Sequence, residues 1–253
     1  MRRGSDDRYK TCNPSADVLR KSVLGRGTGK TELSGTFHPS FAELPASLPI
    51  FPLTGVLLLP RGKLPLNIFE PRYLAMTRDA LAADRMIGMV QPSAEEQPGT
   101  APPVYGTGCA GRITTFSETE DGRFLITLTG VARFEIASEV ATLRGYRRVV
   151  PRWERFKADL AEPSGEAAVD RQRLLNGLRA FFKLHSITAD WSAIEETPNE
   201  RLVTSLAMIC PFAPNEKQAL LEASDLAERS RIMTALIEMA VLRPGADGGP
   251  ARH

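Results

Sequence analysis

The sequence predicts an α+β fold, in which a β-rich first half is followed by a helical second half. Short apolar runs bounded by Gly and Pro fill residues 48–69, and an Asp-Gly pair joins two apolar segments within residues 105–138. From Glu166 onward the apolar residues recur with a helical period instead. The chain of 253 residues is long enough for one large domain or two small ones.

The opening stretch predicts three strands. Apolar runs at 48–53, 56–59 and 64–69 are separated by Thr54-Gly55 and by a basic turn at 61–63. Such short runs between Gly and Pro are typical of buried strands. The prolines within them cannot donate ladder hydrogen bonds, so we expect strands that are short, bulged or at a sheet edge.

A helix is predicted over residues 70–83, and a further strand over residues 86–90. Four residues are spaced so that they lie on one face of this helix, and this face is expected to be buried: Tyr73, Met76, Ala80 and Leu81. A Pro-rich, acidic loop follows at 91–104. We expect this loop to be mobile and to lie over a binding surface.

Residues 105–138 form the clearest β region. The Asp-Gly pair at 121–122 predicts a hairpin between strands at 105–117 and 123–129. The segment 133–136 alternates, with Phe134 and Ile136 inward. Four glycines predict bulges or tight bends of the kind that small closed barrels need: Gly106, Gly108, Gly111 and Gly130.

The second half predicts helices after a linker at 158–168. Thr197 is expected to cap a helix whose first residue is Pro198, with Glu200 reaching back to the cap N–H. A final helix is expected to begin at Asp225. The first helix of this half carries one apolar stripe: Leu174, Leu175, Leu178, Phe181 and Phe182.

Three groups of residues resemble the Lon N-terminal domain family, the substrate-binding domain of ATP-dependent Lon proteases. Residues 108–113 are similar to the family's Gly-Cys-x-Gly-x-Ile strand, and residues 130–134 to its Gly-x-x-Arg-Phe turn. The opening strands and helix match the family's order at Leu48, Pro49, Phe51, Pro52, Leu53, Pro60, Leu64, Pro65, Leu66 and Phe69. The resemblance covers about residues 47–243.

This resemblance implies a fold and a division of the chain. It implies an N-terminal PUA-like, partly closed β-barrel with one helix at 47–157, followed by a C-terminal α-helical bundle at 158–243. Residues 1–46 are expected to be a disordered tail, since they show neither helical nor strand periodicity and few large apolar residues. Eight Lys/Arg against five Asp/Glu make this tail basic. Residues 244–253 are expected to be flexible.

The residue types give little support for catalysis or cofactor binding. The three cysteines are far apart, so neither a zinc site nor a disulfide framework is predicted. Three residues lie between Gly25 and Gly29-Lys30-Thr31, where a P-loop needs four. Of the three histidines only His185 is expected within the fold, as a helix-end or packed histidine. The alternative is a nucleophile–base arrangement with Ser186 or Asp190. We expect no enzyme, no catalytic or metal-binding residue and no cofactor.

The resemblance implies a substrate-binding domain without the ATPase and peptidase domains of Lon, because the chain ends before them. The first hypothesis is therefore a non-catalytic polypeptide-binding module, expected to act in protein quality control as an adaptor, with or without a separate protease. Its partners would be unfolded or hydrophobic polypeptide segments. Leu64, Leu66, Ile68 and Phe69 are the candidate binding residues, although most of the last three should belong to the core.

The alternative is an RNA-binding module that uses the basic and aromatic stretch 144–157. Arg147, Arg148, Arg152 and Trp153 are its candidate residues, because basic and aromatic side chains together hold phosphates and stack bases. The competing explanation is that these arginines protect an edge strand and pair with neighbours such as Glu139 and Glu154. The net charge of +2 disfavours a dedicated nucleic-acid binder. No membrane-spanning run or secretory signal is present, so a cytoplasmic location is expected.

Overall fold

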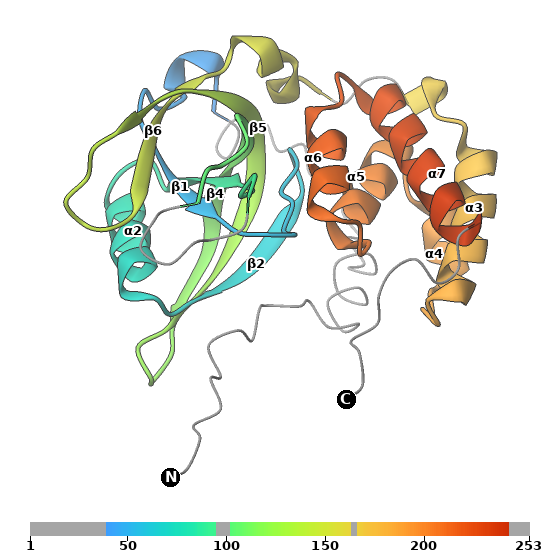
Figure 1. Ribbon diagram of the computed structural model, residues 1–253, viewed down its shortest axis with the longest axis horizontal. Coiled ribbons are helices and arrows are strands. Elements are labelled where there is room, and N and C mark those ends of the chain that lie inside the picture. Colours follow the sequence, from blue (N-terminus) through green and yellow to red (C-terminus); the bar gives the residue numbers. More distant parts are fainter. Residues whose placement is uncertain (1–38, 95–101, 163–165, 243–253) are drawn as a thin grey trace.

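A small β-barrel and a bundle of helices lie side by side in the computed structural model of this chain (Figure 1). The structure describes residues 39–94, 102–162 and 166–242. Most of the predicted N-terminal tail, the middle of the loop 91–104 and the predicted C-terminal tail fall outside these ranges. The α+β architecture predicted from the sequence is confirmed, with the β-rich part first.

One six-stranded sheet forms the barrel. Its strand order is β2-β5-β4-β3-β1-β6, and a further pairing of β5 with β6 closes it. β1 runs parallel to β3, while the other pairs are antiparallel. The strands are β1 (Leu48–Pro52), β2 (Lys63–Ile68), β3 (Met86–Val90), β4 (Thr107–Glu118), β5 (Phe124–Val140) and β6 (Arg147–Arg152).

The closure depends on the length of β5. This strand of 17 residues pairs with β2 along its first half and with β6 along its second half. The predicted turn at 130–134 is wrong, because β5 continues through it. The register of β4 against β5 instead slips between Ala110 and Gly111, which is the kind of bulge that bends a strand around a barrel.

The prediction of a strand at 56–59 is also wrong. Leu57, Leu58 and Leu59 are buried, but they lie in a loop that pairs with no strand. This loop runs directly against β5: a Cβ on Gly130 would stand 2.0 Å from the carbonyl oxygen of Leu59. The apolar run therefore buries side chains into the core without joining the ladder.

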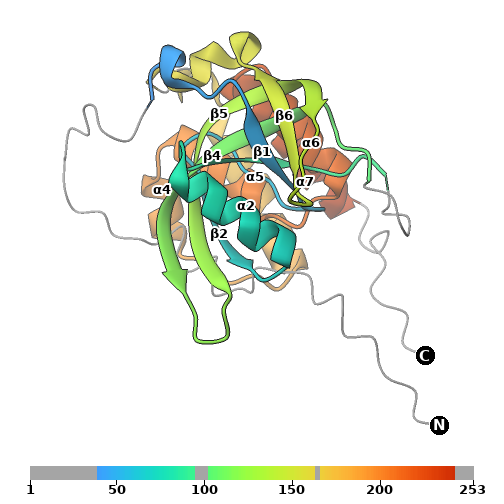
Figure 2. The same cartoon turned by 90° about the vertical axis from the view of Figure 1, so that its left-hand side faces the viewer.

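The helix α2 (Pro71–Ala82) packs against β1 and β3 (Figure 2). Pro71 takes its first position, where the missing N–H costs little. Tyr73, Met76 and Ala80 are buried as predicted, whereas Leu81 is only partly buried.

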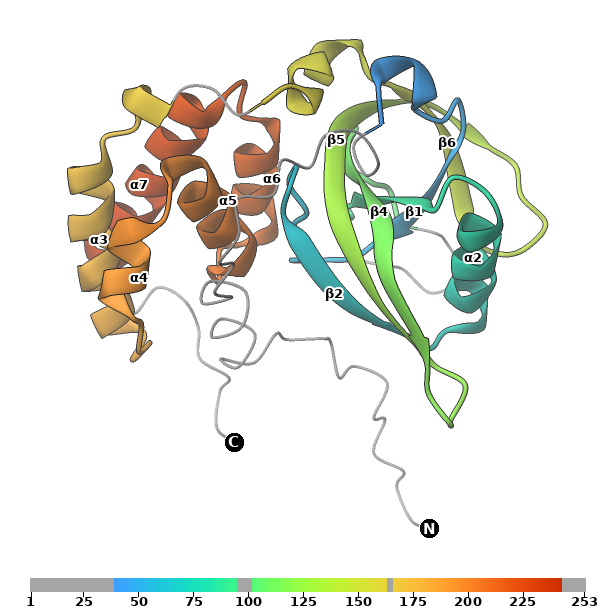
Figure 3. The same ribbon diagram turned by 180° about the vertical axis from the view of Figure 1, so that it is seen from behind.

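The helical half begins after two short 3-10 segments, and Figure 3 shows its helices beside the barrel. The predicted apolar stripe on α3 is confirmed, since all five residues are buried. The elements are η2 (Glu154–Leu160), η3 (Glu166–Ala168), α3 (Arg171–Leu184), α4 (Trp191–Glu196), α5 (Asn199–Ile209), α6 (Pro214–Glu222) and α7 (Leu226–Leu242). A further 3-10 turn, η1 (Phe41–Glu43), precedes the barrel.

The predicted cap of α5 is wrong. Thr197 ends α4 and donates its hydroxyl to the carbonyl of Ala193, and Pro198 occupies the cap position of α5. The carboxylate of Glu166 accepts from the backbone N–H groups of Asn199 and Glu200, each at 2.8 Å. A residue 33 positions upstream of Asn199 therefore caps this helix in place of a local side chain.

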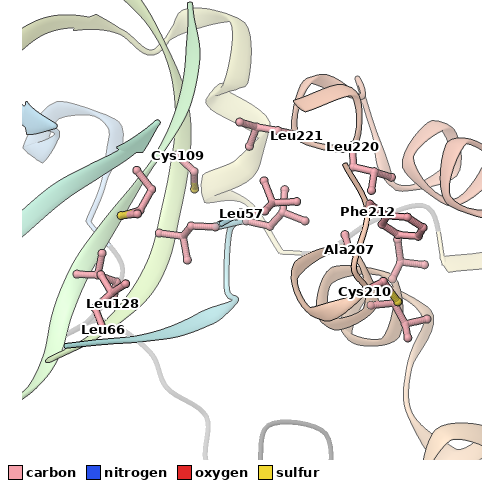
Figure 4. Packing of buried hydrophobic residues seen from close by; sticks show 14 of the residues in the cluster. Leu57, Leu66, Cys109, Leu128, Ala207, Cys210, Phe212, Leu220 and Leu221 are labelled. Atoms are coloured by element: carbon pink, nitrogen blue, oxygen red, sulfur yellow. The ribbon is translucent and has the colours of Figure 1, made fainter. Parts of the chain in front are cut away.

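The two halves share one hydrophobic core. A single cluster of buried residues runs from the barrel interior, at Leu66 and Leu128, to Phe212 and Leu220 in the helices. Figure 4 shows Leu57 of the 53–62 loop lying between these two groups. The barrel and the bundle are thus joined by packing as well as by the chain.

Candidate functional site

The candidate residues on β2 divide into core and surface. Leu66 and Ile68 are buried in the barrel, and Leu64 is half-buried. Phe69 is 56% exposed, because β2 ends at Ile68 and the ring lies outside the barrel. Only Leu64 and Phe69 of the four remain accessible to a ligand.

Leu125 is a second exposed apolar side chain near the end of β2. Leu125 is 46% exposed and stands directly opposite Asn67 of β2, so the two side chains share the outer face of the sheet. Phe69 lies two residues beyond Asn67, and the guanidinium of Arg123 stands 5.9 Å from its ring centroid. We call Leu64, Phe69 and Leu125 the β2 patch. Phe124, Ile126 and Leu128 alternate along this strand, and the apolar Leu125 interrupts that pattern. This interruption was the signal in the sequence for an apolar residue on the outer face.

A buried ion pair between Arg133 and Asp159 joins the barrel to the helices. Asp159 of η2 accepts from Arg133 of β5 at three donors: the backbone N and Nε, both at 2.9 Å, and Nη2 at 2.8 Å. The Arg133 and Asp159 side chains are 4% and 9% exposed. Nη1 of Arg133 donates to the carbonyls of Leu221 and Ala223 at the end of α6.

A second buried arginine completes this junction. Arg229 of α7 donates its Nε to the carbonyl of Leu220, 2.9 Å away. Burial and the charge of Arg133 lower the pKa of Arg229 to about 10, while Asp159 opposes that shift. Two guanidinium groups therefore cap the C-terminal end of α6, where carbonyl groups need donors.

The other end of α6 is bound to the barrel by amides and an amine. Gln218 donates to the carbonyl of Thr107 in β4, and Gln91 donates to the carbonyl of Pro214. Lys217 is buried and donates to the carbonyl of Gly55 at 2.8 Å. Desolvation lowers the pKa of Lys217. No local pattern in the sequence indicates these polar contacts, because they join residues distant along the chain.

The basic stretch 144–157 is largely engaged within the protein. Arg147 pairs with Glu139 and donates to the carbonyl of Pro102, and Arg148 donates to Ser47. Arg152 is 62% exposed, with Glu135 3.9 Å away. The stretch therefore presents one exposed arginine among its three candidates.

The aromatic candidate of this stretch is not accessible. Trp153 is buried, donates its Nε1–H to the carbonyl of Pro45 and packs edge-on against Phe134, 5.6 Å between ring centroids. Tyr146 and Phe156 are buried as well. None of these three rings is placed to stack on a base.

The described cysteines, His185 and Asp190, which were considered for catalysis, are buried or take part in packing and helix capping. Cys109 and Cys210 are buried, and burial raises the pKa of both thiols, which keeps them protonated and unreactive. His185 follows α3 and lies against Phe181, while Asp190 accepts from the N–H of Ala193 at the start of α4. Within the described ranges, no three His, Cys, Asp or Glu residues form a group able to hold a metal ion. None of the helices described is long and apolar enough to cross a membrane.

Comparisons with known proteins agree with this architecture. Residues 47–239 match the family model of the ATP-dependent protease La (LON) substrate-binding domain. Lon protease 2 of Myxococcus xanthus is 26% identical over 199 residues, which are 77% of this chain and 24% of that protein. Lon protease of Flavobacterium johnsoniae is 32% identical over 204 residues, covering 74% and 23%. The chain thus spans about a quarter of the length of the curated relatives it matches.

Two solved structures share the fold. One is described as the crystal structure of a Lon N-terminal domain protein from Xanthomonas campestris, with TM-score 0.51 and 24% identity over 75% of this chain and 97% of that one. The other is the N-terminal domain of Lon protease from the Mycobacterium avium complex, with TM-score 0.53 and 15% identity over 76% and 98%. The family model matches the substrate-binding domain rather than a catalytic domain, and it spans the barrel and nearly all of the helical half: this chain belongs to the Lon substrate-binding domain family.

Proposed function

We propose that this chain is a non-catalytic module that recognises unfolded or hydrophobic polypeptide segments. Membership in the Lon substrate-binding domain family carries the proposal, and the exposed Phe69 and Leu125 of the β2 patch support it. Apolar segments of a client would remove Phe69 and Leu125 from water on binding, which is the main source of affinity for such surfaces. We further propose that the module delivers these clients to a protease as a quality-control adaptor in the cytoplasm.

The proposal is tested by fluorescence anisotropy with a labelled, reduced and carboxymethylated polypeptide that cannot fold. We expect binding that changes little with salt and weakens when Phe69 and Leu125 are both changed to Ser. Leu143→Ser is the matched control, because Leu143 is fully exposed on a different hairpin. No binding by the unaltered protein, or equal losses in both variants, would contradict the proposal.

A parallel titration uses labelled single-stranded RNA, the ligand of the alternative hypothesis. Nucleic-acid binding through arginines falls steeply as salt rises. RNA binding that is salt-sensitive and lost on changing Arg147, Arg148 and Arg152 together to Ala would favour the alternative. We expect no RNA binding, because Arg147 and Arg148 already have partners within the protein.

A further inference from the structure

The strand β2 has one unpaired edge. It pairs with β5, and among the residues that the structure describes no strand lies along its other edge (Figure 3). The register shows which backbone groups face that edge. Gly130 donates its N–H to the carbonyl of Gly62, and the alternation of an antiparallel pair then makes Leu64, Leu66 and Ile68 the residues that exchange hydrogen bonds with β5. Lys63, Pro65 and Asn67 alternate with them and direct their backbone groups away from β5.

The position of Pro65 fits this arrangement. Its ring removes a backbone N–H that would otherwise point to the unpaired edge, so no hydrogen bond to β5 is lost. The edge keeps the N–H groups of Lys63 and Asn67 and the carbonyls of Lys63, Pro65 and Asn67. The side-chain Oδ1 of Asn67 is buried and accepts no hydrogen bond from the described residues.

Each face of the sheet offers an apolar side chain close to this edge. Leu64 is half-buried on the inner face, and Phe69 and Leu125 are exposed on the outer face. A strand laid along β2 would therefore bring apolar side chains of both faces into contact with the β2 patch. An irregular or helical segment would leave the donors and acceptors of the edge unpaired.

The positive charge of Lys63 at the start of the edge favours an acidic residue in the bound segment. Lys63 is exposed and forms no ion pair within the described chain. An extended segment with a carboxylate opposite Lys63 would gain an attractive interaction there, whereas a basic segment would be repelled. The edge thus suits an apolar, extended segment that carries an acidic residue at one end.

We infer that this edge binds its polypeptide by strand addition, with the bound segment extended along Lys63, Pro65 and Asn67. The inference rests on the proposed polypeptide-binding function and names the mode of recognition. In this mode backbone hydrogen bonds are independent of sequence, so one surface accepts many clients, while the β2 patch selects for apolar side chains.

A second copy of the chain is a poorer occupant. Two β2 strands paired about Pro65 would place two residues without an N–H opposite each other, and both central hydrogen bonds would be missing. An unfolded client offers N–H groups at every residue other than proline.

Amide hydrogen exchange read by NMR tests the inference directly. In the free protein, the amides of Lys63 and Asn67 should exchange rapidly, while those of Leu64 and Leu66 should be protected by β5. The added ligand is a synthetic peptide of alternating Val and Thr with one terminal Asp. We expect it to protect the amides of Lys63 and Asn67. Binding that leaves both amides unprotected would overturn strand addition while leaving the proposed function intact.

A pair of variants isolates the backbone contribution. Asn67→Pro removes one edge N–H without removing a hydrogen bond to β5, and Asn67→Ala removes the side chain but keeps the N–H. We expect Asn67→Pro to weaken peptide binding about tenfold and Asn67→Ala to change it less than about twofold. Circular dichroism and thermal unfolding establish that both variants fold.

Each remaining outcome has a defined meaning. Equal affinities for folded Asn67→Pro and Asn67→Ala would overturn the inference. Loss of self-association in Asn67→Pro, with peptide binding unchanged, would assign the edge to a second copy instead. If the unaltered protein binds neither this peptide nor the unfolded polypeptide, the proposed function fails first.

Discussion

Both carboxylate oxygens of Asp159 accept hydrogen bonds from the guanidinium of Arg133, at 2.8 and 2.9 Å, although the two residues belong to different elements of the fold. Arg133 lies on a barrel strand, and Asp159 lies in the 3-10 segment that leads to the helices. The guanidinium also stands 4.3 Å from the ring centroid of Phe156. This pair holds the end of α6 against the barrel through the carbonyls of Leu221 and Ala223.

Removing one member of the pair should destabilise the whole chain. Arg133→Ala leaves Asp159 buried without its cation, and we expect a loss of about 3–5 kcal/mol in the free energy of unfolding. Urea unfolding followed by circular dichroism measures it. Arg155→Ala, which breaks the half-exposed pair with Glu135, is the control and should cost less than about 1 kcal/mol. Similar losses in the two variants would show that the buried pair has no special role.

Gly130 should tolerate no side chain. A Cβ at this position would stand 2.0 Å from the carbonyl oxygen and 2.7 Å from the carbonyl carbon of Leu59, and neither backbone atom can move aside cheaply. We expect Gly130→Ala to lose at least about 3 kcal/mol in the free energy of unfolding or to fail to fold. Gly106→Ala is the matched control, because its Cβ would meet nothing within 4 Å. A thermal shift assay on both variants distinguishes close packing from a general intolerance of substitution.

The cap of α5 should depend on Glu166. Changing Glu166 to Ala removes the acceptor for the N–H groups of Asn199 and Glu200, and we expect a loss of about 1 kcal/mol. Glu162→Ala removes an exposed carboxylate from the same connecting segment and should have little effect. Chemical unfolding measures both losses, and a Glu166→Ala variant that is no less stable than Glu162→Ala would show that Glu166 does not cap this helix.

Lys217 should give the folded protein a distinct alkaline pH dependence. Desolvation lowers its pKa in the folded state, whereas the unfolded chain keeps a value near 10.5. Between these two values the unfolded state binds more protons, so the free energy of unfolding rises with pH. The penalty of burying the charge is therefore present at lower pH and is relieved as pH approaches 10.5.

The comparison with Lys217→Met isolates this effect. We expect the stability of the unaltered protein to improve relative to the variant as pH rises toward 10.5, measured by urea unfolding at several pH values. Lys183→Met, at an exposed position on α3, controls for the general alkaline response. A stability difference that is flat across this range would mean that Lys217 is not desolvated.

Local patterns in the sequence predicted much of the fold. The stripe of α3 and the alternation around Phe134 repeat with the period of their element. The stripe and Phe134 are buried as expected, whereas Ile136 is only partly buried. The Asp-Gly hairpin is confirmed, with Gly122 at φ +79°. These features depend on neighbours within a few residues, which a single sequence displays.

The junction and the candidate surface depend on distant residues and were not predictable in this way. The alternation that buries Phe134 sends Arg133 to the other face, and nothing local indicates that η2 and α6 cover that face. Asp159 lies in a stretch predicted to be a linker. Phe69 was expected to belong mainly to the core with its neighbours, but β2 ends one residue earlier and leaves it exposed.

The position of β1 has a consequence for synthesis on the ribosome. β1 is the first of the described strands to be made, yet its partners are β3 and β6, and Leu48 stands opposite Val149. At translation rates of about 5–20 residues per second, roughly 5–20 seconds separate these two residues. During that interval one edge of the nascent β1 has no partner strand from its own sheet. The pairing of β1 with β6 is therefore completed late, and a chaperone that binds nascent apolar strands would meet β1 first.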